Sequence, residues 1–391
     1  MKELRLIELF AGYGSQLMAL KRLGTVKRSY RISEWEVNAV RSYNAVHCMD
    51  REDHSKGMTY DDVVTALDGL GISNDGKTPM SIEKIRKKGE EWCRRTYSDF
   101  IATHNVGSIT NIHASDLDIV DTNKYDYLLT YSFPCQDLSL AGKQKGMKKG
   151  TRSGLLWEVE RLLDECEELP KYLLMENVPQ VHSKRNIDDF KRWCAKLQSL
   201  GYTSYWEDLC AKDYGIPQNR TRCFMVSILG NRNYHFPKPF RLERTLKDFL
   251  EDDAEPETSE FLYRMSTWRA FHNPLEEVCG MSGIVPTLTT RTENSSSSVM
   301  VAPCERKTIN AREEIRKNNG ECSLEIRRLT PRECGRLMGV SDEDIDAMEK
   351  VSTKSQLYKQ FGNSIVVDVL YYIFKELLAA EKDLFDELVG W

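Results

Sequence analysis

The chain contains no run of eighteen apolar residues, so no segment has the length and composition of a membrane-spanning helix. Its first residues enter a strand-like pattern directly, without the separate hydrophobic region of a signal peptide. We therefore expect a cytoplasmic protein that has no membrane partner. No internal repeat is apparent, which argues against a repeat architecture.

Paired cysteines are also missing, although the sequence has eleven cysteines. The cysteines lie far apart, include no Cys-x-x-Cys pair and are odd in number, which argues against a disulfide framework and against a zinc site. We expect reduced thiols and no metal. Most of them, such as Cys166 and Cys194 in helix-like patterns, are expected to be small core residues.

Positive charge is in short supply, because 55 Lys and Arg face 60 Asp and Glu and the net charge is −5. Taken alone, this argues mildly against a nucleic-acid partner, since phosphate binding relies on basic side chains. The positive charge is unevenly distributed along the chain, because residues 142–152 carry five basic residues and no acid. This stretch is either a solvated loop or a local anion-binding patch.

The 391 residues suit a globular protein with one large domain or two smaller ones. Strand-like and helix-like patterns alternate in the first part, which predicts an α/β fold with a mainly parallel, Rossmann-like sheet covered by helices on both faces. The expected strands are residues 4–10, 29–33, 127–130, 172–175, 203–207 and 223–228. The expected helices begin near residues 15 and 37 and cover 155–166 and 187–200.

Beyond residue 230 the alternation is lost, and prolines, an acidic run at 251–257 and a serine tract predict a smaller, more irregular domain. Residues 364–378 again have the pattern of a buried amphipathic helix. A polar stretch at residues 51–106 interrupts the first domain, and we expect it to form a turn at Asn74-Asp75-Gly76 followed by an exposed helix over 84–95.

Ligands of such sheets bind at the carboxyl ends of the strands, where this sequence has two features typical of a nucleotide site. Phe10-Ala11-Gly12-Tyr13-Gly14 follows the first strand, and its glycines would let the backbone approach a ligand and turn into a helix. Glu34-Trp35 ends the next strand and offers a carboxylate for ribose hydroxyls and a flat indole for adenine. A packing turn and a surface glutamate beside a core tryptophan are the alternatives.

Two further strands also end in reactive groups. Cys135 follows the strand at 127–130, and Glu176-Asn177 follows the strand at 172–175. By itself, Cys135 would be read as a small core residue. Glu176 could equally be a helix cap, and Arg220 with Arg222 an exposed edge pair.

In their order, these motifs resemble the cytosine-C5 DNA methyltransferases, together with Gln218-Asn219-Arg220-Thr221-Arg222 and Gly362-Asn363-Ser364. The resemblance covers about residues 4–370 and implies a class I fold dependent on S-adenosylmethionine. It implies a catalytic domain at 1–230, a target-recognition domain at 231–345, and a segment at 346–391 that returns to the catalytic domain. The catalytic half is most similar to bacterial enzymes that methylate CpG, but the smaller domain does not share that likeness, so we predict no target sequence.

The resemblance implies methyl transfer from S-adenosylmethionine, without a metal, to C5 of cytosine in a specific double-stranded DNA sequence. Since C5 is a poor nucleophile, a thiolate must first add at C6, and the base must leave the duplex to meet it. The catalytic residues carried over are Cys135 for this addition, Glu176 at N3, Arg222 at O2, and Arg220.

The resemblance also implies the binding residues and the partners. The cofactor would be bound by Phe10, Gly12, Gly14, Glu34, Trp35, Asp116, Leu117, Pro134, Leu155, Asn363 and Ser364. DNA would be bound by Gln136, Ser139, Lys143, Lys145, Thr287 and Arg291, with residues 136–149 closing as a lid. We expect a bacterial or phage-encoded monomer whose activity does not require a cognate restriction endonuclease.

Two alternatives belong to other classes. A thiol-dependent amidase or protease would need His104, His113 or His182 beside the sulfur of Cys135. A catalytically inactive DNA-binding module derived from the same family would retain the fold and lose the chemistry.

Overall fold

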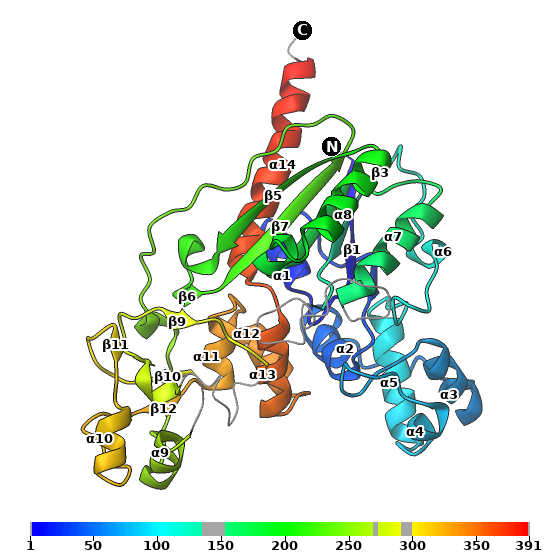
Figure 1. Cartoon of the computed structure of the whole chain (residues 1–391). Helices are drawn as coiled ribbons and strands as arrows, with labels where there is room; N and C mark the ends of the chain where they lie inside the picture. The colour runs from blue at the N-terminus through cyan, green and yellow to red at the C-terminus, as the bar shows by residue number, and fades with distance from the viewer. Residues whose placement is uncertain (1, 135–152, 269–272, 291–298, 390–391) are drawn as a thin grey trace. The chain divides into compact units, whose positions relative to one another are not determined.

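The computed structural model describes residues 2–134, 153–268, 273–290 and 299–389 (Figure 1). Contacts between Cα atoms divide the chain into two compact units. The first unit comprises Met1–Leu209, Arg222–Pro237 and Leu370–Trp391, and the second comprises Cys210–Thr221 and Lys238–Val369.

This division differs from the boundaries expected at 230 and 345. Residues Cys210–Thr221 join the second unit because β6 (Gln218–Asn219) pairs with β9 (Val285–Pro286). The chain returns to the first unit only at Leu370, inside helix α14 (Val367–Val389).

The first unit is built on a six-stranded sheet in the order β2-β1-β3-β4-β7-β5. Its strands are β1 (Glu3–Leu9), β2 (Arg31–Ser33), β3 (Tyr125–Tyr131), β4 (Tyr172–Asn177), β5 (Tyr202–Cys210) and β7 (Thr221–Leu229). The neighbours β2, β1, β3 and β4 run parallel, and β7 runs antiparallel to β4. The expected mainly parallel α/β sheet is confirmed, and the carboxyl ends of β1 to β4 share one edge with the start of β7.

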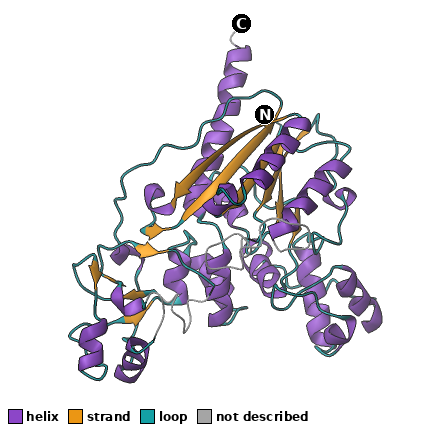
Figure 2. Ribbon diagram, viewed as in Figure 1, coloured by secondary structure: helices purple, strands orange, loops and turns teal. Residues whose placement is uncertain are grey.

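Helices cover both faces of this sheet (Figures 1 and 2). Alternate strand residues such as Leu9, Leu129 and Met175 enter one core cluster with Trp157 of α7 (Leu156–Glu165) and Trp193 of α8 (Ile187–Ser199). Helices α1 (Ser15–Arg22) and α14 lie on the other face (Figure 1). Because both faces are covered, the strands are near-continuous apolar runs rather than alternating ones.

The stretch at 51–106 is a small folded subdomain and not an exposed helix. It contains α3 (Tyr60–Gly69), α4 (Ile82–Arg86) and α5 (Glu90–Ala102), which share a core with α2 (Val37–Tyr43). The helix expected over 84–95 is wrong, because Gly89, at φ 88°, separates α4 from α5, and Ile85 and Cys93 are fully buried. The turn at 74–76 is confirmed, since Asp75 Oδ1 accepts hydrogen bonds from the amides of Lys77 and Thr78.

The second unit consists of short elements, as its composition predicts. A four-stranded sheet has the order β11-β8-β10-β12, made of β8 (Val278–Cys279), β10 (Met300–Val301), β11 (Thr308–Ile309) and β12 (Arg327–Arg328). Its helices are α9 (Ser259–Ser266), α10 (Arg312–Lys317), α11 (Pro331–Arg336), α12 (Asp342–Glu349) and α13 (Lys354–Asn363). Within the described residues, no helix combines the length and the apolar composition needed to cross a membrane.

Candidate active site

The turn after β1 has the shape expected of a ligand-binding loop. Phe10 and Gly12 both adopt left-handed backbone conformations, at φ 60° and 57°. A Cβ at Gly12 would meet no atom within 4 Å, so this glycine leaves open space above the backbone. Gly14, at φ 85°, is required for packing, because a Cβ there would lie 2.4 Å from Nε2 of His47.

Glu34 is joined to this turn directly. Its Oε2 accepts a hydrogen bond from the Gly12 amide at 2.9 Å, and its Oε1 accepts from the amides of Trp35 and Glu36 at 2.9 and 2.8 Å. Burial raises the pKa of Glu34, and these backbone amides oppose that shift by stabilising the carboxylate. The carboxylate and the glycine turn therefore form one preorganised unit.

Two residues of the 51–106 stretch, Asn105 and Ser73, hold the Glu34-Trp35 backbone in place. Asn105 brackets Glu34, since its Oδ1 accepts from the Glu34 amide at 3.1 Å and its Nδ2 donates to the Glu34 carbonyl at 2.9 Å. Ser73 donates its amide to the carbonyl of Trp35 at 2.7 Å. Sequence patterns did not reveal Asn105 or Ser73, because neither lies in a motif and both are more than 35 residues from their partners.

Four other predicted cofactor residues belong to the first unit. Asp116 is exposed on the short helix α6 (Ala114–Leu117), and its Oδ2 accepts from the amide of His113 at 2.8 Å. Leu117 is fully buried in the core, so its side chain cannot line a ligand pocket and only its backbone remains available. Leu155 is partly buried against the same core, and Pro134 is half-buried just after β3.

Glu176 and Arg222 meet where β4 ends and β7 begins. Arg222 Nε lies 3.1 Å from Glu176 Oε1, and their side chains are 15% and 11% exposed. The antiparallel register explains the meeting, because Glu176 is opposite Phe224 and Asn177 is opposite Cys223. A nearly buried ion pair of this kind holds its carboxyl group in one orientation.

Asn177 links this pair to the exit of β3. Its Nδ2 donates to the carbonyl of Phe133 at 2.9 Å, and its Oδ1 accepts from the Val178 amide at 2.9 Å. Asn177 at the end of β4 therefore fixes the backbone at Phe133, which precedes Cys135 by two residues in the sequence. Cys135 itself lies outside the described residues, as do Gln136, Ser139, Lys143, Lys145 and Arg291.

Arg220 has the contacts of a structural residue. Its guanidinium is 3% exposed and donates to the carbonyls of Leu288, Gly362 and Ser364 at 2.8, 3.1 and 2.5 Å. These contacts favour a positioning role within the second unit, and the catalytic role of Arg220 stays a prediction. Gln218 acts in the same way, since it donates to the carbonyl of Leu337 and accepts from the amide of Leu288.

Three predicted binding residues lie in the second unit with Arg220. Thr287 Oγ1 donates to the carbonyl of Asn219 at 2.7 Å, so in this conformation the hydroxyl proton is not available to a DNA phosphate. Asn363 is exposed at the end of α13, and Ser364 is the C-cap of that helix. Since they belong to a different unit from Glu34, their contribution to one cofactor pocket remains a prediction.

The three histidines that could serve a thiol-protease mechanism have other partners. His104 Nδ1 lies 3.3 Å from the carbonyl of Tyr30, His113 Nδ1 lies 3.2 Å from Glu165, and His182 Nε2 lies 3.0 Å from Asp208. These contacts favour structural roles for all three histidines.

A mainly parallel sheet with a glycine turn, a carboxylate just after the next strand and an acid–arginine pair at the same edge is typical of an α/β enzyme with a nucleotide-type site. The family model described as C-5 cytosine-specific DNA methylase matches residues 58–379. The chain belongs to this family, and it is a DNA (cytosine-5)-methyltransferase.

Individual relatives agree with the family match. The chain is 35% identical over 384 residues to the type II methyltransferase M2.ScrFI of Lactococcus lactis subsp. cremoris, covering 97% of this chain and 100% of that protein. It is 40% identical over 257 residues to the orphan methyltransferase M.SssI of Spiroplasma monobiae, covering 64% and 65%. The solved structure of the Entamoeba histolytica methyltransferase EhMeth has the same fold, with a TM-score of 0.69, 16% identity and 97% and 99% coverage.

Proposed function

We propose that this enzyme transfers a methyl group from S-adenosylmethionine to C5 of a cytosine that has been flipped out of a specific double-stranded DNA sequence. The observation that carries the proposal is the Glu176–Arg222 pair, held at the strand edge where Asn177 also fixes the exit of β3 toward Cys135. A carboxyl and a guanidinium held together are two of the groups that addition to a pyrimidine ring requires, and the thiol of Cys135 would be the third.

The reaction follows from these side chains. The Cys135 thiolate adds to C6, and the electron pair of the C5–C6 bond moves to C5, while Glu176 in its protonated form donates to N3 and Arg222 donates to O2. The nucleophilic C5 takes the methyl group, C5 then loses its proton to solvent, and elimination of the Cys135 thiolate restores the aromatic ring. Free cysteine titrates near pH ~8.5, so basic groups beside Cys135 would favour the reactive thiolate.

The first unit has residues that fit the methyl donor. Gly12 leaves open space for a close approach, Glu34 presents a preorganised carboxylate for ribose hydroxyls, and half-buried Trp35 offers a ring face for adenine. Bound S-adenosylmethionine supplies an electrophilic methyl on a sulfonium. We further propose that Phe10, Asp116, Pro134, Asn363 and Ser364 complete its site.

We assign target selection to the second unit and lid closure to residues 136–149. Lys143 and Lys145 would contact phosphates, and Arg291 would read a base edge. The protein would act as a monomer in a bacterial or phage-infected cytoplasm, and methyl transfer needs no partner endonuclease.

Trapping on DNA that contains 5-fluorocytosine tests the covalent mechanism. Since fluorine cannot leave C5 as a proton does, the wild-type enzyme should form a stable covalent complex in the presence of S-adenosylmethionine. Cys135→Ser should form none, whereas Cys93→Ser, which changes a buried thiol in the subdomain, should react as the wild type does. Methyl transfer without any trapped complex would reject the Cys135 mechanism, and absence of both would favour an inactive binding module.

The duplex in this trapping experiment should carry the enzyme's own target. Bisulfite sequencing of DNA from cells that express the protein should reveal cytosines protected within one short motif. Protection without a shared motif would contradict sequence-specific recognition by the second unit.

A further inference from the structure

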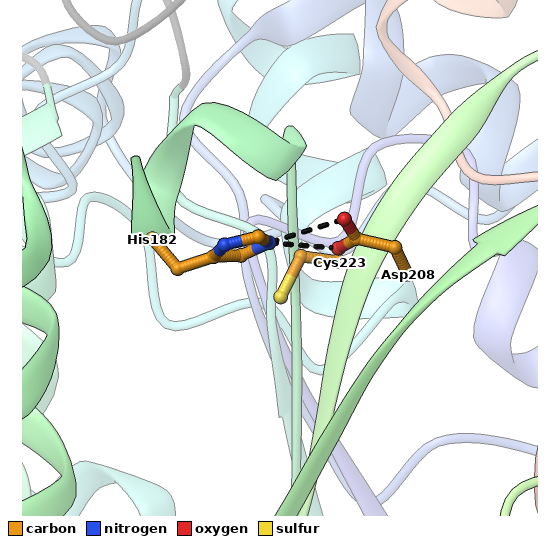
Figure 3. A group of neighbouring side chains, drawn as sticks. All are labelled: His182, Asp208 and Cys223. Atoms are coloured by element: carbon orange, nitrogen blue, oxygen red, sulfur yellow. Dashed lines mark hydrogen bonds and ion pairs between the residues drawn. The ribbon is translucent and has the colours of Figure 1, made fainter. Parts of the chain in front are cut away.

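Three side chains with metal-binding atoms lie close together in the first unit (Figure 3). The imidazole of His182, the carboxylate of Asp208 and the thiol of Cys223 have ligand atoms within 4.8 Å of one another. His182 ends the 3-10 helix η3 (Pro179–His182), Asp208 lies in β5 and Cys223 lies in β7. Sequence spacing gave no sign of this group, because its members are 26 and 15 residues apart.

The geometry gives the cluster an open side and a buried base. His182 Nε2 lies 3.0 and 3.1 Å from the two oxygens of Asp208, and the side chains of these two residues are 22% and 33% exposed. Cys223 is fully buried below them. The imidazole is held by aromatic neighbours, with ring centroids 4.8 Å from Trp206 and 6.0 Å from Phe190.

These contacts argue against a second thiol nucleophile. Nε2 of His182 faces the carboxylate, and the sulfur has no exposed surface on which to meet a substrate. Burial, together with nearby Asp208 and Glu176, raises the pKa of Cys223, so the thiol is protonated and unreactive at neutral pH.

The donor set identifies the class of ligand. Nitrogen, thiolate and carboxylate oxygen are the ligands of zinc and neighbouring transition metals, whereas calcium and magnesium prefer oxygen alone. Neighbouring ligands of a tetrahedral zinc lie roughly 3.5 Å apart. His182 Nε2 and the Asp208 carboxylate, at 3.0 Å, are already near this spacing, and the Cys223 sulfur lies within 4.8 Å of both, so side-chain rotation of His182 and Asp208 needs to provide no more than about 1 Å of approach to the sulfur.

We propose that His182, Asp208 and Cys223 bind one zinc-class divalent transition-metal ion, with solvent completing its coordination. The site is separate from methyl transfer, since successive residues of a strand point to opposite faces and Arg222 therefore points away from Cys223. A bound ion joins η3, β5 and β7 behind the Glu176–Arg222 pair and stabilises the first unit.

Cobalt titration of the full-length protein tests the proposal, with a phosphine in place of thiol reductants. We expect one Co²⁺ per chain, a thiolate-to-cobalt charge-transfer band, and loss of that band when Zn²⁺ is added.

Variants decide whether these three residues are the ligands. Cys223→Ser and His182→Gln should abolish the band, Asp208→Asn should weaken binding at least about tenfold, and Cys93→Ser should bind as the wild type does. Since Cys223 is a core residue, circular dichroism should establish whether Cys223→Ser is folded. If Cys223→Ser is unfolded, His182→Gln, at a more exposed position, shows whether this cluster binds the metal. Absence of the band in the wild type, or its survival in His182→Gln, would overturn the proposal.

Discussion

Glu8 and His47 are ionisable residues buried beneath the glycine turn. Glu8 accepts hydrogen bonds from Ser29 and Tyr43 at 2.6 and 2.7 Å, and burial raises its pKa to about 7. His47 Nε2 lies 2.9 Å from the carbonyl of Tyr13, and burial lowers its pKa to about 3, with nearby Lys21 acting in the same direction. Folding therefore favours neutral forms of both groups.

The two residues should give the free energy of unfolding opposite pH dependences. Relative to wild type, Glu8→Gln should gain stability as pH rises from 4.5 to 7, because wild-type Glu8 stabilises the fold when protonated and loses that contribution over this window. His47→Gln should lose relative stability as pH rises from 3 to 6.5, because neutral His47 stabilises the wild type above that window. Each slope should approach about 1.4 kcal/mol per pH unit.

Urea unfolding of the three proteins at several pH values between 4.5 and 6.5 measures these slopes. In the wild type the two contributions offset each other across this range. Parallel profiles for Glu8→Gln and His47→Gln would contradict the assignment.

Gly362 illustrates a glycine required by close packing. A Cβ at this position would lie 2.4 Å from the carbonyl carbon of Thr289 and 2.5 Å from the Thr290 nitrogen, so Gly362→Ala should destabilise the second unit by about 1–3 kcal/mol. Gly69→Ala is the matched control, since no atom lies within 4 Å and alanine favours helix α3 by roughly 0.5–1 kcal/mol. Thermal unfolding should show opposite shifts, and equal shifts would exclude the steric explanation.

At the scale of elements, the subdomain at 51–106 supports the proposed cofactor site through Asn105. Asn105→Ala removes two hydrogen bonds to the Glu34 backbone and should weaken S-adenosylmethionine binding by about tenfold. Asn105→Asp keeps the hydrogen-bond acceptor, loses the donor and adds a negative charge beside Glu34. This variant should therefore bind S-adenosylmethionine more weakly than Asn105→Ala does. Calorimetry with S-adenosylmethionine measures the change in Kd. In steady-state kinetics the same change should raise KM for S-adenosylmethionine more than it lowers kcat.

A control separates this effect from general loss of stability. Asn111 is an exposed residue that donates to the Gly69 carbonyl at 3.1 Å, and Asn111→Ala should leave cofactor affinity unchanged. Equal affinities for Asn105→Ala and wild type would show that Glu34 does not need this support.

Elements that obey a simple periodicity were predictable from sequence, and elements stabilised by distant contacts were not. The strands before Phe10 and Glu176 and the helix at 187–200 follow from local apolar patterns. The subdomain was underestimated because its apolar residues form a core with α2, which precedes it in the chain, so no local pattern shows what they pack against. Arg220 and Arg222 are two residues apart, yet the boundary between the units falls after Thr221, the first residue of β7, so one joins each unit.

At the scale of the whole molecule, a net charge of −5 means that DNA must be held by local basic patches. The proposed lid supplies one such basic patch. The double variant Lys143→Ala/Lys145→Ala should therefore reduce the magnitude of the slope of log affinity against log salt by roughly 2, one unit for each lost phosphate contact. The exposed pair Lys84→Ala/Lys87→Ala in the subdomain is the control and should leave the slope unchanged. Filter binding across a salt series measures both, and equal slopes for the two variants would rule out lid contacts with phosphate.

The bracket that Asn105 forms around Glu34 has a consequence for biosynthesis. The two residues are 71 positions apart, so the entire intervening segment must emerge from the ribosome before Asn105 can form its hydrogen bonds with Glu34. Glu34 emerges early, but its two hydrogen bonds with Asn105 can form only after residue 105 has emerged as well. A nascent chain halted before residue 105 should therefore expose an unfinished loop that proteases cleave, and one halted well beyond it should resist them.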